Sequence, residues 1–149
     1  TSNRRLISNQ LVKGLDAQGN ETPNWDLNIL VGAGGIVSSV ADLSRFALAQ
    51  FNDSDQVLAL TRKPTFNLQA NKADIGLGWA VIRNQHGISF MHSGGTGGYR
   101  SNIVLDVANK NGVIILSNLS AFHKQNMNID NLGKRLMETL KNLDPVPQQ

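Results

Sequence analysis

Four short segments with alternating apolar side chains, separated by turn residues, constrain the fold more than any other feature of the sequence. They span residues 75–83, 88–92, 99–106 and 112–117. Turn-forming residues occupy 84–87 and 108–112, and the second of these turns contains Asn111-Gly112, a typical hairpin signal. Strands connected in this way pair as neighbours. The pattern therefore predicts an antiparallel β-sheet over residues 75–117.

Two helices are predicted outside this region. Ser39-Val40-Ala41-Asp42 resembles a capping box, and apolar residues recur at helical spacing from Val40 to about Phe51. A second apolar stripe runs over 129–143, with Asp130 in its first turn, Lys141 in its last, and Pro145 and Pro147 ending it. We expect an α+β fold, an antiparallel β-sheet flanked by helices, with the helix of 129–143 packed across one face.

The rest of the chain contains weaker signals. Residues 1–31 are polar and rich in turn residues, which predicts a connecting segment with a short strand around 11–15. Residues 52–74 contain Pro64 with several Asn and Asp residues, and are predicted to form a loop with one helical turn. A length of 149 residues is appropriate for one folded domain.

Composition excludes several classes of function. The net charge of +3 is small and scattered, so nucleic acid is not an expected partner. No apolar run approaches the ~20 residues of a transmembrane segment. Glycine patterns of dinucleotide or phosphate loops are absent, as are metal-ligand spacings such as His-Glu-x-x-His, so no cofactor and no metal are expected. There are no cysteines for disulfides or thiol catalysis.

The run from His92 to Tyr99 is the strongest candidate site. It follows an expected strand and places a basic ring and a hydroxyl before glycines at 94, 95, 97 and 98. Side chains of these types contact substrate anions, and glycine allows backbone N–H groups to approach an oxyanion. A hydrogen-bonded structural histidine and a simple glycine turn are the alternatives. The other histidines, His86 and His123, are expected to be exposed to solvent.

The run resembles the third motif of the serine β-lactamase and penicillin-binding-protein family, usually Lys-Thr-Gly on an edge strand. Here the motif reads His92-Ser93-Gly94. Other segments resemble class C-like members in the same order, and the resemblance covers roughly residues 10 to 143. These segments are Ala33–Phe46, Ile75–Trp79, Thr96–Asp106 and Gly112–Asn118.

Two motifs of that family are absent from this sequence. No serine has a lysine three positions later, so there is no Ser-x-x-Lys nucleophile motif. Tyr99 is the sole tyrosine, and it does not begin a Tyr-x-Asn motif. Residues 1–149 therefore resemble the C-terminal part of a larger serine hydrolase. We divide them into a connecting segment (1–31), a helix and loop (32–74), and sheet strands with a terminal helix (75–149).

The resemblance implies a role for each matched residue in acyl transfer through a serine acyl-enzyme. His92 and Ser93 would contact the carboxylate or leaving-group side of the substrate. The backbone N–H of Gly95 would be one oxyanion donor. Because an imidazole carries less positive charge at neutral pH than the usual lysine, His92 favours an esterase, a D-amino-acid peptidase or a weak β-lactamase.

The resemblance also implies substrate-binding roles for Gly94, Thr96 and Asn118, and it places the nucleophile outside this chain. Expected partners are a β-lactam, ester or D-amino-acid peptide as substrate, and the missing N-terminal half or a second copy of the chain. The expected location is the bacterial periplasm or the exterior. A catalytically inactive binding or interaction domain derived from the same fold is the alternative function.

Overall fold

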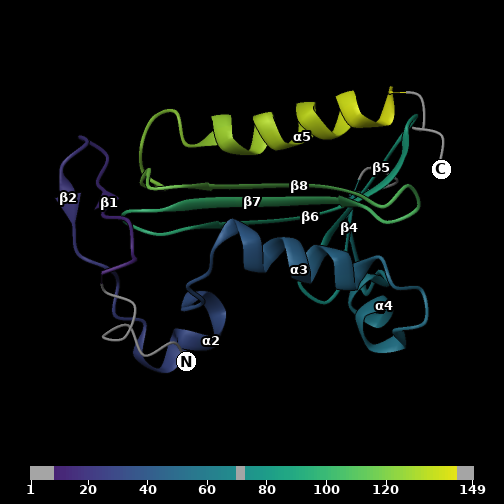
Figure 1. Ribbon diagram of the computed structural model, residues 1–149, viewed down its shortest axis with the longest axis horizontal. Helices are drawn as coiled ribbons and strands as arrows, with labels where there is room; N and C mark the ends of the chain where they lie inside the picture. The colour runs from purple at the N-terminus through teal and green to yellow at the C-terminus, as the bar shows by residue number, and fades with distance from the viewer. Residues whose placement is uncertain (1–8, 70–72, 144–149) are drawn as a thin grey trace.

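The computed structural model describes residues 9–69 and 73–143. Its centre is a six-stranded antiparallel sheet, and Figure 1 shows this sheet between helices. The strands lie in the same order in the sheet as in the chain. They are β3 (Phe66–Gln69), β4 (Ala73–Ile75), β5 (Ala80–Asn84), β6 (Gly87–Gly95), β7 (Arg100–Asp106) and β8 (Asn111–Ser117). The predicted α+β class with an antiparallel sheet is confirmed.

Helices cover both faces of this sheet. Helix α5 (Met127–Lys141) packs on β7 and β8 from one side, as predicted, although it begins and ends two residues before the expected 129–143. Helices α3 (Val40–Gln50) and α4 (Gln56–Arg62) lie on the other side (Figure 1). The predicted helix end at Pro145 and Pro147 falls outside the described residues. In the described part of the chain, no helix is long and apolar enough to cross a membrane.

Each face of the sheet has its own hydrophobic core. Val104 and Val113 pack against Met137 of α5, whereas Leu105 packs against Ala47 of α3 and Trp79. Val104 and Leu105 are neighbours in β7, and successive side chains in a strand point to opposite faces. The alternation within β7 therefore divides its residues between the two cores. The same alternation decides which face of the sheet each side chain of the candidate site occupies.

The structure corrects the predicted loop over residues 52–74. Asp55 caps helix α4 by accepting a hydrogen bond from the Leu58 N–H over 3.0 Å, and Pro64 follows shortly after the helix end. Beyond α4, residues 66–69 and 73–75 form strands β3 and β4. The predicted start of α3 is confirmed, since Ser39 accepts from the Asp42 N–H over 3.2 Å.

The expected strand over 75–83 is interrupted. Strand β4 ends at Ile75 and β5 begins at Ala80, with a turn between them. Gly78 in this turn has a φ of 90°, a conformation that favours glycine. The turn buries Trp79, whose ring stacks on Phe46 at 6.3 Å between centroids.

The segment before α3 is more structured than predicted. The short strand expected around 11–15 appears as β1 (Gly14–Leu15), and it pairs with β2 (Glu21–Thr22), which was not predicted. A 3₁₀ turn, η1 (Asn28–Leu30), and a short helix, α2 (Val31–Gly34), follow. Leu15 joins the end of the main sheet by an isolated parallel bridge to Leu119.

Candidate active site

The end of β6 has one open edge. This strand extends past the predicted 88–92 to Gly95, so the third-motif residues lie within it. Pairing between β5 and β6 stops at Ala80 and Met91, whereas β7 pairs with β6 as far as Gly95 and Arg100. Among the described residues, none pairs as a strand with 92–95 on the β5 side.

The register fixes the direction of the Gly95 N–H. Beyond the strands, the Thr96 N–H donates to the Tyr99 carbonyl over 2.9 Å, which makes these two residues a hydrogen-bonded pair. Hydrogen-bonded and non-hydrogen-bonded pairs alternate in an antiparallel ladder. Gly95 and Arg100 are therefore a non-hydrogen-bonded pair, and the Gly95 N–H points away from β7 toward the open edge. Gly95 is also exposed.

His92 is held in place by the turn before β5. It is exposed, and its Nδ1 lies 2.6 Å from the carbonyl oxygen of Gly78. Because a carbonyl only accepts hydrogen bonds, Nδ1 carries a proton in this contact. In the neutral ring, Nε2 then has a free lone pair. The residue opposite His92 in β7, Ile103, belongs to the core on the α3 side, so His92 faces away from α5.

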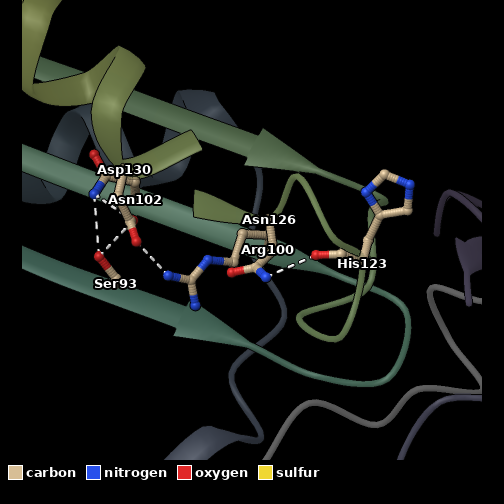
Figure 2. A network of polar contacts seen from close by, with 6 residues as sticks. All are labelled: Ser93, Arg100, Asn102, His123, Asn126 and Asp130. Atoms are coloured by element: carbon tan, nitrogen blue, oxygen red, sulfur yellow. Dashed lines mark hydrogen bonds and ion pairs between the residues drawn. The ribbon is translucent and has the colours of Figure 1, made fainter. Parts of the chain in front are cut away.

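The Ser93 hydroxyl lies on the other face of the sheet, under helix α5 (Figure 2). It donates to Oδ1 of Asp130 over 2.7 Å and accepts from Nδ2 of Asn102 over 3.1 Å. Asn102 and Asp130 are only 2% and 4% exposed. The side chains of His92 and Ser93 thus point to opposite faces of the sheet. The predicted contact between Ser93 and a substrate stays a prediction.

Arg100 completes this buried cluster. Its guanidinium forms an ion pair with Oδ2 of Asp130, while Nδ2 of Asn102 donates to Oδ1 of the same carboxylate over 3.0 Å (Figure 2). The sequence patterns do not single out Arg100 or Asn102, and they indicate only a helix-dipole role for Asp130. The available signal was three polar residues, Arg100, Asn102 and Asp106, at alternate positions along β7.

The glycine-rich loop after β6 packs tightly. A Cβ at Gly98 would lie 2.9 Å from the Gly14 Cα, and one at Gly95 would lie 2.6 Å from the Ala121 Cβ. Thr96 is half-buried in this loop, where its hydroxyl oxygen accepts from the Gly98 N–H over 3.4 Å. Close packing therefore accounts for glycine at these positions, independently of any approach to a substrate.

Asn118 contacts β1. Its side-chain amide donates to the Lys13 carbonyl over 3.0 Å, and its own carbonyl accepts from the Leu15 N–H over 3.0 Å. The predicted roles of Thr96, Gly94 and Asn118 in substrate binding stay predictions.

The other two histidines lie apart from His92. His86 is exposed in the β5–β6 turn, as expected, but His123 is half-buried, and its Nδ1 accepts from the Gln125 N–H over 3.1 Å. Within residues 9–69 and 73–143, no group of three His, Cys, Asp or Glu side chains is arranged to hold a metal ion.

Comparison with known proteins gives consistent results. The family model described as Beta-lactamase matches residues 3–133. A class C beta-lactamase aligns with a TM-score of 0.73 at 16% identity, over 89% of this chain and 44% of that one. A class C beta-lactamase in complex with cefoxitin aligns with a TM-score of 0.72 at 15% identity, over 86% and 44%.

A beta-lactamase/D-alanine carboxypeptidase from Pseudomonas syringae aligns with a TM-score of 0.74 at 15% identity, over 97% of this chain and 48% of that one. At these identities the likeness concerns the fold. The chain spans less than half the length of these structures. No curated protein matches the sequence.

Proposed function

This chain belongs to the beta-lactamase family, and from that premise we propose that it forms one wall of the active site of a serine hydrolase. The enzyme would cleave amide or ester bonds through an acyl-enzyme. The observation that carries the proposal is the open edge of β6, which contains the exposed residues His92 and Gly95 and the outward-pointing Gly95 N–H. An oxyanion donor must be held in a fixed direction and be reachable by the substrate, and a backbone N–H at this edge meets both requirements.

The proposed reaction has two steps. A serine from the remainder of the fold attacks the substrate carbonyl and loses its proton to a base there, and the carbonyl oxygen becomes an oxyanion that receives the Gly95 hydrogen bond. The C–N or C–O bond then breaks, and the leaving group takes a proton. Water hydrolyses the acyl-enzyme by the same route and releases the acid and the serine.

His92 determines the proposed substrate class. With Nδ1 bonded to the Gly78 carbonyl, the neutral ring offers Nε2 as a hydrogen-bond acceptor. A lysine in this position would offer charged donors and no acceptor. The enzyme would therefore favour esters or peptides with an N–H group near Nε2 over substrates that rely on a carboxylate. D-amino-acid peptides, which carry N–H groups, and simple esters, which do not rely on a carboxylate, fit this preference better than β-lactams, and they suit an exported bacterial enzyme.

The proposed partner is the N-terminal half of the same fold. Large apolar side chains on and around α2, α3 and α4 are exposed: Ile29, Leu30, Ile36, Leu48 and Val57. Large apolar side chains exposed on neighbouring elements support an interface here. The matched structures contain more than twice the length of this chain, which supplies enough protein to cover this surface. Co-expression of this chain with the segment that precedes it should give a 1:1 complex by light scattering, whereas self-association alone would favour a second copy.

The full-length protein provides the test of function. We expect turnover of a short-chain p-nitrophenyl ester and slower turnover of a chromogenic cephalosporin. This chain alone should hydrolyse neither, because it has an oxyanion donor without a nucleophile. Saturable turnover by the chain alone, abolished in His92→Ala, would mean that the catalytic residues are elsewhere.

The alternative is an inactive binding domain. It is favoured by the absence of Ser-x-x-Lys and Tyr-x-Asn from these residues. Reading the upstream coding sequence distinguishes the two functions, because both motifs upstream indicate the hydrolase and an unrelated domain or a stop codon indicates the binding role.

A further inference from the structure

We propose that Arg100 and Asp130 are positioning residues, which hold the end of β6 so that the Gly95 N–H keeps its direction at the open edge. The catalytic consequence of this inference rests on the proposed function, but the positioning itself can be measured without activity. Neither side chain would touch the substrate.

Asp130 connects helix α5 to both strands that border the glycine loop. Its Oδ1 accepts from Ser93 on β6 over 2.7 Å and from Asn102 on β7 over 3.0 Å, and its Oδ2 pairs with Arg100. One carboxylate therefore fixes the separation of the two strands immediately before they part. Figure 2 shows the four side chains converging between the sheet and the helix.

Gly95 rests on the guanidinium of this cluster. A Cβ at Gly95 would lie 3.0 Å from Nη1 of Arg100, so the Arg100 side chain passes directly beneath the Gly95 Cα. In the described part of the chain, residues 92–95 have no strand partner on the β5 side. The Arg100 side chain and strand β7 therefore support Gly95 in place of a strand on the β5 side. This arrangement leaves the edge free for a substrate.

Stability alone does not account for a charged cluster at this position. A buried ion pair often contributes less to stability than well-packed apolar residues of similar volume. The middle of the same helix–sheet interface is apolar, with Val104, Val113 and Met137. Two buried atoms of the cluster, Nε of Arg100 and Oδ1 of Asn102, have no hydrogen-bond partner among the described residues, which adds to its cost.

The far end of α5 provides a matched control. There Lys141 and Asp106 form a second buried ion pair between the same helix and β7, with 3.5 Å between Nζ and Oδ2, and Lys141 also donates to the Ser89 hydroxyl over 2.9 Å. Asp130→Asn and Asp106→Asn each remove one charge from a buried pair on this interface. Only the first variant changes the pair that includes Arg100, the residue opposite Gly95.

The direct experiment measures the NMR order parameter of the Gly95 N–H in the labelled full-length protein. We expect a rigid value of about 0.85 in the wild type and in Asp106→Asn, and a decrease to about 0.6 or below in Asp130→Asn. Arg100→Lys, which keeps the charge but loses the planar fork, should also lower it and provides a second variant if Asp130→Asn does not fold. An unchanged value in both variants, or an equal decrease in Asp106→Asn, overturns the inference.

Kinetics on the same proteins test the catalytic consequence. Asp130→Asn and Arg100→Lys should lower kcat by about 10- to 100-fold, because displacement of a donor by even about 1 Å is costly, while KM changes by less than about threefold. Inhibition by phenylboronic acid, whose tetrahedral serine adduct carries the oxygen in question, should weaken in parallel with kcat. A wild type that turns over no ester or cephalosporin contradicts the proposed function and leaves the order parameters to decide the positioning inference.

Discussion

Ser93 and Asp130 are joined across the helix–sheet interface, with the serine hydroxyl of β6 donating to Oδ1 of the aspartate in the first turn of α5 over 2.7 Å. An aspartate in a first turn already interacts favourably with the helix dipole. Here the same carboxylate also attaches the helix to the strand that carries the candidate oxyanion donor. The structural and the proposed catalytic parts of the site therefore share one buried side chain.

Ser93→Ala should lower the free energy of unfolding of the full-length protein by about 1.5–3 kcal/mol, because a buried carboxylate loses a hydrogen bond. The measurement is urea denaturation. Ser101→Ala is the control, because Ser101 is on the opposite face at the neighbouring register position, and its effect should stay within about 0.5 kcal/mol. Equal effects of the two substitutions would mean that the hydrogen bond between Ser93 and Asp130 contributes little.

Gly133→Ala should destabilise the protein although alanine is the better helix former. A Cβ at Gly133 would lie 2.1 Å from Oδ1 of the buried Asn102, so α5 would have to move away from the sheet. Overpacking of this kind costs about 1–3 kcal/mol, more than the ~1 kcal/mol that the helix gains. Asn131→Ala at an exposed position of the same helix is the control and should be neutral or stabilising. A higher melting temperature for Gly133→Ala would contradict the close contact.

Local sequence signals predicted most of the sheet and both long helices, because alternation, turn residues and caps act over a few neighbouring residues. The local signals were misleading where two of them conflict within one segment. Asp55 caps a short helix inside a segment rich in loop-forming residues, and Gly78 interrupts an apolar run with a positive φ that the pattern does not reveal. In the site, alternation places His92 and Ser93 on opposite faces. Tertiary packing decides which face of the sheet α5 covers. It also brings Arg100 and Asp130 together there, so local sequence signals do not predict this contact.

His92→Lys in the full-length enzyme should shift substrate preference toward compounds with a carboxylate. Lysine presents charged donors where the neutral imidazole presents an acceptor, and an exposed ion pair contributes up to ~1 kcal/mol, or about two- to fivefold in kcat/KM. The comparison uses matched anionic and neutral acyl substrates, with His92→Gln as an uncharged control. An unchanged ratio would mean that His92 does not face the substrate.

The β1–β2 hairpin should loosen in acid. Backbone hydrogen bonds, first from the Asn20 N–H and also from Gln18, hold the pKa of Asp16 below its ordinary value of 3.8. A depressed folded-state pKa gives stability that is present above the unfolded value and is lost as pH falls through the folded value. The Gly14 and Thr22 amide signals should therefore change below about pH 4. In Asp16→Asn this pH dependence should disappear, and its persistence would assign the transition to another group.

The most direct test of the central claim is a crystal structure of the full-length protein with phenylboronic acid bound to its nucleophilic serine. One boronate oxygen occupies the place of the oxyanion, and we expect it about 2.7–3.1 Å from the Gly95 nitrogen, with His92 beside the adduct. An adduct whose oxygens lie away from the open edge of β6, with Gly95 uncontacted, would contradict the assignment of Gly95 as an oxyanion donor.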